Sequence, residues 1–260
     1  MLKNKKGIVF GMANDHSIAW GIAKQLNEQG ASIAVTYQND NFLKRIEPLA
    51  KSIDSELIIP CDVSKNGDIS NCFQKVLQKW DSLDFIIHSI AYSNKNELAG
   101  KYIDTSLENF LNTLVVSCYS LTEIAREGSK IMKNGGSIVT LSFYGSQKVM
   151  PNYNVMGISK AALETSVKYL SVDLGGQKIR VNAISAGPMR TLSGAAVANA
   201  REVFKHTQKY SPLKRNVDLK EIGESALYLV SDLSSGVTGE TLYVDCGYNI
   251  IGMPQIKKEI

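Results

Sequence analysis

Short apolar segments alternate with helix-length amphipathic segments along the chain, and this alternation limits the possible folds more than any other sequence feature. The predicted strands are 7–10, 32–37, 57–59, 84–88, 137–141, 179–184 and 241–244. The predicted helices are 17–28, 42–50, 69–80, 107–127, 153–174 and 218–230. Strands separated by helix-length segments form parallel crossovers, and strands rich in Ile and Val suit a sheet buried on both faces. The sequence therefore predicts an α/β fold, a single-domain, doubly wound parallel sheet that is Rossmann-like, with helices on both faces.

The length and composition fit one globular domain. A chain of 260 residues exceeds the prior of ~150 residues per domain, but single α/β domains often reach ~250. A hydrophobic fraction of 44% and a charged fraction of 21% exclude a disordered chain, a collagen and a coiled coil. We therefore expect one Rossmann-like domain over residues 1–260. Its helices at 17–28 and 107–127 are expected to end at Gly30 and Gly128, because glycine commonly ends helices.

The charge and cysteine content argue against several other classes of protein. The net charge of +4 is mild and comes with no dense basic block, so we expect no nucleic-acid partner. No apolar run approaches the ~20 residues that span a bilayer, and no signal-peptide core follows the start, so we expect a soluble cytoplasmic protein that binds no membrane. The four cysteines form no CxxC pair and no histidine lies close to one, so we predict reduced thiols and no metal site.

The turn after the first predicted strand is the first candidate for cofactor binding. It is not a GxGxxG sequence, but Gly11 permits a tight turn and Ser17 can cap the following helix. The helix N-terminus would then present free N–H groups to a pyrophosphate. Gly21 would let this helix pack close to its strand. The alternative is an ordinary capped helix with no ligand.

Three further strand ends agree with a nicotinamide cofactor. Gln38 ends the second strand, where it can bind ribose hydroxyls without charge. No arginine follows at once to hold an extra phosphate, so we predict NADH, with NADPH as the weaker alternative. Asp62, beside Val63, can accept a hydrogen bond from the adenine amino group. The small run Ser89–Ile90–Ala91 can line the cofactor, whereas His88 reads as a hydrogen-bonded core residue.

Tyr153 and Lys160 are the candidate catalytic pair. Seven residues bring a helix back to almost the same face after two turns, so a helix that begins near Tyr153 places both side chains on one stripe. The ammonium can bind ribose hydroxyls, and the phenol can donate a hydrogen bond to an oxygen that gains negative charge. Taken alone, the pair is better explained by a half-buried tyrosine and a solvated lysine.

Several motifs closely resemble the short-chain dehydrogenase/reductase branch of enoyl-acyl carrier protein reductases, in order and over essentially the whole chain. They are 17–21 (SIAWG), 36–40 (TYQND), 151–157 (PNYNVMG), 159–161 (SKA) and 180–188 (RVNAISAGP). The resemblance implies NADH-dependent reduction of trans-2-enoyl thioesters to saturated acyl thioesters in bacterial fatty-acid elongation. It also implies that Ile18 contacts the cofactor. The alternatives are another short-chain reductase acting on carbonyls or enones, or a non-catalytic nicotinamide-binding sensor.

The spacing around Lys160 separates this chain from the carbonyl reductases of the superfamily. Those enzymes have a tyrosine four residues before the lysine and a serine seventeen before it, whereas here the two positions hold Met156 and Phe143. Many enoyl reductases of this type have tyrosine where this chain has Phe143, so any essential role for that hydroxyl is in doubt. Phe143 becomes a candidate wall of the nicotinamide pocket, and Tyr144 is expected to face the opposite way.

The resemblance also assigns a substrate-covering lid to about residues 189–210. Within it, the Met189 backbone and the Thr191 hydroxyl would meet the nicotinamide amide and the phosphates. Small residues through Ala200 suit a mobile cover. Leu192 and Ser193 are further cofactor candidates. The substrate candidates are Ser93, Phe143, Tyr144, Met156 and Val197.

Two kinds of partner follow. Arg201 and Lys205 lie four residues apart on the helix after the lid, where they could steer an acidic acyl carrier protein carrying the enoyl substrate. The alternative is a solvated cationic face. By resemblance the protein is a homotetramer, and the apolar ending 248–253 is a candidate interface.

Overall fold

A seven-stranded parallel sheet organises the protein. The structure is a computed structural model that describes residues 1–195 and 197–253. Within these ranges the strand order is β3-β2-β1-β4-β5-β6-β7. The strands are β1 (Lys6–Phe10), β2 (Ser32–Tyr37), β3 (Leu57–Pro60), β4 (Phe85–His88), β5 (Gly136–Ser142), β6 (Ile179–Ala186) and β7 (Thr241–Val244). Every predicted strand is confirmed, with ends shifted by at most two residues.

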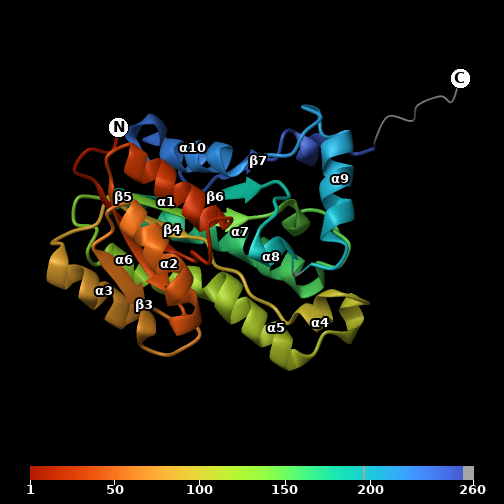
Figure 1. The fold of residues 1–260 in the computed structure, drawn as a ribbon, viewed down its shortest axis with the longest axis horizontal. Helices are drawn as coiled ribbons and strands as arrows, with labels where there is room; N and C mark the ends of the chain where they lie inside the picture. The colour runs from red at the N-terminus through yellow and green to blue at the C-terminus, as the bar shows by residue number, and fades with distance from the viewer. Residues whose placement is uncertain (196, 254–260) are drawn as a thin grey trace, which may run out of the picture.

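Helices cover both faces of this sheet. One face carries α1 (Ile18–Glu28), α2 (Asp40–Ser52) and α10 (Leu219–Val230), and the other carries α3 (Asp68–Lys79), α6 (Ser120–Ser129) and α7 (Asn154–Gly175). Figure 1 shows α4 (Lys95–Leu98), α8 (Leu192–Ala195) and α9 (Ala200–Tyr210) gathered beyond one end of the sheet. The shorter or linking helical segments are α5 (Leu107–Leu114), η1 (Tyr102–Asp104), η2 (Val115–Tyr119), η3 (Tyr144–Ser146), η4 (Asp232–Ser234) and η5 (Tyr248–Ile250).

Alternate residues of the central strands enter two separate cores. Ile8 and Ile86 pack in the core under α3, α6 and α7, whereas Val9 and Ile87 pack in the core under α1, α2 and α10. All four side chains are fully buried. Burying a side chain of this size stabilises the fold by ~1.5–3 kcal/mol. The doubly wound prediction is therefore confirmed.

Two glycines, Gly128 and Gly21, have structural roles other than those predicted. Gly128 does not end the predicted long helix; it lies inside α6, where an added Cβ would come within 2.2 Å of Ile86 Cδ1. The same helix is interrupted by the π-helical segment η2. Gly21 allows α1 to pack close to α10, not to a strand, because its Cβ would lie 2.9 Å from Leu219 Cβ. In contrast, Gly30 follows the end of α1 with φ of +93°, as predicted.

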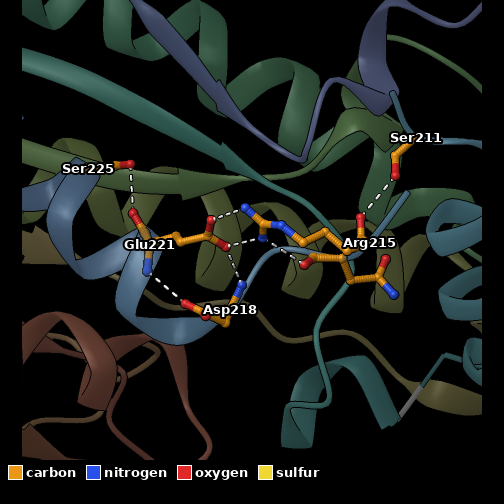
Figure 2. Close-up of polar contacts among 6 residues, drawn as sticks. Ser211, Arg215, Asp218, Glu221 and Ser225 are labelled. Atoms are coloured by element: carbon orange, nitrogen blue, oxygen red, sulfur yellow. Dashed lines mark hydrogen bonds and ion pairs between the residues drawn. The ribbon is translucent and has the colours of Figure 1, made fainter. Parts of the chain in front are cut away.

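The segment between α9 and α10 is held by a polar network (Figure 2). The Arg215 guanidinium donates two hydrogen bonds to the Glu221 carboxylate, at 2.6 and 2.8 Å. Asp218 and Glu221 form a capping box at the start of α10, and the Ser211 hydroxyl donates to the Arg215 carbonyl oxygen at 2.9 Å. The end of α9 is thus tied to the start of α10. None of the helices in the described ranges is both long and apolar enough to cross a membrane.

Candidate active site

The carboxyl ends of β1 and β4 lie side by side at the point where the strand order reverses. Gly11, directly after β1, has φ of +93°, and an added Cβ would lie 1.9 Å from the Ser89 carbonyl oxygen. Only glycine fits such a turn, so the tight turn predicted here is confirmed. Doubly wound folds bind dinucleotides at this kind of switch point.

Ser17 caps α1, the helix that follows the turn at Gly11. Its hydroxyl accepts a hydrogen bond from the Trp20 amide at 3.4 Å and donates one to the Asn14 carbonyl oxygen at 2.7 Å. The predicted cap is therefore present. The first amides of α1, beginning at Ile18, carry the partial positive charge of a helix N-terminus. This end of the helix suits an anion such as a pyrophosphate.

Gln38 and Asp62 meet at the ends of β2 and β3. The Gln38 amide donates to the Asp62 carboxylate at 3.3 Å, and Ser64 donates to the same carboxylate from its hydroxyl and its backbone amide. Partial burial raises the pKa of Asp62, but these hydrogen bonds from Ser64 and Gln38 outweigh it and hold the pKa below its usual value. Asp62 is therefore ionised at neutral pH and ready to accept hydrogen bonds.

Small and half-buried residues line the same edge of the sheet. Ser89, Ile90 and Ala91 follow β4, and Val63 follows β3. Ile90 and Val63 rest against the core under α3, α6 and α7. Their contact with a cofactor stays a prediction.

Lys160 is buried on α7, with its ammonium held at the end of β5. The ammonium donates to the Leu141 carbonyl oxygen at 2.7 Å. Burial lowers the pKa of Lys160 to about 8, against the opposing influence of Cys118 and Glu164. Lys160 is thus a buried cation that titrates close to neutral pH, not the solvated surface lysine of the alternative interpretation.

Tyr153 immediately precedes α7 in a helical backbone conformation. Burial, and to a smaller extent the charge of Glu164, raise the pKa of the Tyr153 phenol above its usual range. The phenol therefore stays protonated and can donate a hydrogen bond. The helix that carries Lys160 begins at Asn154, one residue later than predicted, and Asn154 has φ of +33°, so Tyr153 lies just outside the regular helix and not on it.

Phe143 packs against the ring of Tyr153, edge to face. Their ring centroids are 5.1 Å apart with an interplanar angle of 69°. Tyr144 points elsewhere, toward Tyr248, with ring centroids 6.0 Å apart. The two neighbours therefore have different ring partners, but both follow the last residue of β5, so the strand alternation expected here does not set their directions. Phe143 therefore packs directly against the ring of the candidate catalytic residue Tyr153. Its predicted contact with a nicotinamide ring stays a prediction.

Two of the predicted substrate residues, Met156 and Ser93, lie in different surroundings. Met156 is buried in a small cluster with Leu98 and Val155, against which Ala91 and Tyr153 pack. Ser93 lies in a buried polar group, where it donates to the Asn109 side-chain oxygen at 3.2 Å and accepts from Thr113. The Ser93 hydroxyl is therefore already paired within the protein.

The segment after β6 forms a compact turn. The Thr191 hydroxyl accepts from the Gly194 amide at 2.9 Å, and the Thr191 amide donates to the Met189 carbonyl oxygen at 2.9 Å. Leu192 is largely exposed and Val197 is half-buried. The Ser193 side chain, a predicted cofactor contact, lies outside the part of the chain that the structure describes, as does residue 196. The Asn152 amide donates to the Ala198 carbonyl oxygen at 2.9 Å, which joins this segment to the loop before α7.

The sequence profile of the family described as Enoyl-(Acyl carrier protein) reductase matches residues 11–249. The chain belongs to this family. It is 52% identical to Enoyl-[acyl-carrier-protein] reductase [NADH] 2 of Rhizobium meliloti, over 99% of this chain and 96% of that protein.

Solved structures of this reductase family have the same fold. FabI from Candidatus Liberibacter asiaticus superposes with a TM-score of 0.96 at 53% identity, covering 98% of both chains. The enoyl-acyl carrier protein reductase of Anaplasma phagocytophilum, solved in complex with NAD, gives a TM-score of 0.95 at 53% identity, covering 98% of this chain and 97% of that one. The fold and family implied by the sequence motifs are confirmed.

His88 is a core residue in this member of the reductase family, as predicted. Its ring nitrogens meet the Thr140 hydroxyl at 2.7 Å and the Ser120 hydroxyl at 2.8 Å. Burial, followed by the charge of Lys160, lowers the pKa of His88 to about 3. The ring is therefore neutral, and it joins β4, β5 and α6 beneath the candidate site.

Sequence reasoning missed two buried polar residues of the site, Glu164 and Asn109. Glu164 lies four residues after Lys160, so helical spacing already placed it on the same stripe as the candidate pair. Asn109 had no comparable signal, because its partners come from a loop some fifteen residues away in sequence.

The four cysteines are all buried and none is in a disulfide. Across the described ranges, no group of three or more His, Cys, Asp or Glu side chains is arranged to hold a metal.

Proposed function

We propose that the protein is an NADH-dependent enoyl-acyl carrier protein reductase in which Tyr153 and Lys160 are the catalytic residues. One observation carries the assignment: the buried Lys160 ammonium bonds to Leu141 at the carboxyl end of β5, and Tyr153, protonated over the neutral pH range, precedes the same helix. The names of the similar proteins, which specify NADH and enoyl-acyl carrier protein, support the choice of cofactor and substrate.

The residues at the carboxyl edge fit NADH. The turn at Gly11 has no space for a Cβ, and it precedes a capped helix N-terminus that suits a pyrophosphate. Gln38 is neutral, so it can bind ribose hydroxyls without demanding the extra phosphate of NADPH. The proposed cofactor contacts are Gly11, Ser17, Ile18, Gln38, Asp62, Val63, Ser89, Ile90, Ala91, Lys160, Met189, Thr191, Leu192 and Ser193.

The chemistry divides between the cofactor and two side chains. When bound, NADH supplies a hydride to the β-carbon of the enoyl thioester. The electron pair of the double bond then moves toward the thioester carbonyl oxygen, and Tyr153 donates a hydrogen bond to that oxygen. Lys160, whose ammonium bonds to the Leu141 carbonyl oxygen at the end of β5, would hold the ribose hydroxyls of the bound cofactor. A proton from water or a relay completes the saturated product at the α-carbon.

The substrate is proposed to lie beside Tyr153, under a cover formed by about residues 189–210. The hydrogen bond between Asn152 and the Ala198 carbonyl supports this placement, because it joins that segment to the loop before Tyr153. The proposed contacts of the acyl chain are Ser93, Phe143, Tyr144, Met156 and Val197.

The cofactor and substrate class can be tested in one assay. Purified protein with a short trans-2-enoyl thioester is expected to oxidise NADH at least tenfold faster than NADPH at equal concentration, a factor that corresponds to ~1.4 kcal/mol. Absorbance of the reduced cofactor measures both rates. Turnover with neither cofactor would reject the enzymatic function, and faster turnover with NADPH would reject the role of Gln38 in cofactor choice.

A basic surface on α9 fits the acidic acyl carrier protein. Arg201, Lys205 and Lys209 are exposed on this helix, which forms the second part of the proposed cover. Arg215, which follows α9, contributes less to this surface, because its guanidinium is engaged by Glu221. Charges around a substrate entrance raise the rate of encounter with an oppositely charged partner.

Reversing two of these charges tests the carrier surface. The Arg201→Glu/Lys205→Glu variant is expected to raise KM for carrier-bound substrate on the order of tenfold, and the effect should shrink at high salt. KM for a free enoyl thioester should not change. The matched control is Lys3→Glu/Lys133→Glu, which alters the net charge equally at the opposite, amino edge of the sheet. An unchanged KM for the carrier-bound substrate would reject the surface, whereas an equal loss with the free thioester would indicate misfolding.

A homotetramer in the cytoplasm is also part of the proposal. The outer surface of α5 and its continuation exposes an apolar stripe at four-residue spacing, Leu107, Leu111 and Val115, and α7 exposes Tyr169 and Val172. The apolar ending 248–253 adds two largely exposed side chains at its Ile250 and Met253. Apolar patches of this kind suit contact between copies of one chain.

A further inference from the structure

Glu164 is a buried carboxylate that the proposed mechanism does not use. It lies on α7 four residues after Lys160 and is 5% exposed. Helical spacing would allow an ion pair between these two side chains. The Lys160 ammonium bonds to Leu141 instead, and the Glu164 oxygens bond to a different part of the site. A carboxylate removed from water without strong partners would be costly.

Three donors from one short segment satisfy the Glu164 carboxylate. Oε1 accepts from the Ser142 hydroxyl at 2.6 Å and from the Ser146 hydroxyl at 2.5 Å, and Oε2 accepts from the Gln147 amide at 2.8 Å. The donors span the end of β5 and the short helix η3. One side chain of α7 therefore holds the whole segment 142–147 against the helix.

The segment held by Glu164 is also the segment that contacts Tyr153. Phe143 packs edge to face on the Tyr153 ring at 5.1 Å. Gly145 lies so close that an added Cβ would be 2.5 Å from Tyr153 Cδ1, and the Gly145 carbonyl oxygen closely approaches Gly157 of α7. The position of the phenol ring thus depends on where segment 142–147 lies.

We propose that Glu164 is a positioning residue for the reduction, holding segment 142–147 so that Phe143 and Gly145 fix the ring of Tyr153. This inference rests on the proposed function of Tyr153. Displacing a reacting group by about 1 Å can cost ~10²-fold in rate, so a carboxylate that never touches the substrate can still control turnover. The charge of Glu164 also contributes to raising the pKa of Tyr153, after burial, which keeps the phenol protonated.

A double-mutant cycle separates this role from general stabilisation. Glu164→Ala is expected to lower kcat roughly 10–100-fold with KM for NADH unchanged. In the Tyr153→Phe background the same substitution should change kcat less than about twofold, because residues that act through one group are non-additive. The matched control is Asp173→Ala, which removes an exposed carboxylate from the same helix and should leave kcat unchanged. Equal losses of kcat from Glu164→Ala in both backgrounds would overturn the proposal.

A second variant keeps the Glu164 side chain and removes two of its three donors. Ser142→Ala/Ser146→Ala leaves the Glu164 side chain in place but frees segment 142–147 from it, and is expected to lower kcat about as much as Glu164→Ala. It also serves as the test if Glu164→Ala does not fold, as judged by thermal unfolding and NADH fluorescence. Native kcat in this serine variant would overturn the proposal. A Tyr153→Phe enzyme with native turnover would instead reject the proposed role of Tyr153, and this inference with it.

Discussion

Replacing Tyr153 by phenylalanine is expected to lower kcat for a trans-2-enoyl thioester by about 10²–10⁴-fold, with KM for NADH changed less than about threefold. The substitution removes one hydroxyl and keeps the ring that Phe143 and Gly145 contact. The loss falls on kcat because the oxygen of the thioester gains its charge only as hydride arrives. Steady-state NADH oxidation measures both constants.

A second tyrosine provides the control for this substitution. Tyr228→Phe removes a phenol hydroxyl from α10, on the opposite face of the sheet, and should leave kcat unchanged. Thermal unfolding of the two variants should agree within a few degrees. A Tyr153→Phe enzyme with native kcat would show that another group stabilises the charged oxygen.

Replacing Lys160 by methionine is expected to lower kcat/KM for NADH by about 10²-fold or more. The variant loses the buried cation that faces the proposed ribose site, while methionine fills much of the same space. In the native protein, kcat/KM for NADH should fall as pH rises through about 8, where the free enzyme loses the Lys160 proton. Lys160→Met should lack this limb of the pH profile. A native pH profile in the variant would contradict the assignment.

The same substitution should not weaken the fold. The pKa of Lys160 is about 8 in the folded chain, below its ordinary value of 10.5. Below pH 8 both states carry the proton, so burial of the cation costs ~3 kcal/mol there; between about pH 8 and 10.5 the unfolded chain holds more protons, and stability rises with pH. Lys160→Met should therefore unfold in urea at an equal or higher midpoint at pH 7. A lower midpoint would mean that the ammonium is a net stabiliser.

The fold could be predicted because its signals are local. Each strand is a short Ile- and Val-rich run, and the cap at Ser17 and the turn at Gly11 depend on neighbours in sequence. Gly128 misled the prediction because a glycine inside a helix that packs closely on Ile86 looks, in sequence, like a helix stop. The π-helical turn at η2 interrupts the predicted long helix and had no signal in the sequence.

The candidate site was only partly accessible from the sequence. Tyr153 and Lys160 could be paired by helical spacing, but the burial of Lys160 and its bond to Leu141 join segments nineteen residues apart. The role of Glu164 was hidden for the same reason, because its donors come from segment 142–147. Sequence spacing can place residues on a common stripe, but it cannot say which strand or loop covers that stripe.

The Tyr153 phenol is proposed to stabilise the negative charge that forms on the thioester oxygen of the substrate. Single-turnover reduction of an enoyl thioester, with NADH already bound to native and Tyr153→Phe protein, tests it most directly because cofactor binding and product release do not contribute. We expect hydride transfer to be at least about 10²-fold slower in the variant, with equal binding of NADH. Equal rates in the two proteins would contradict it.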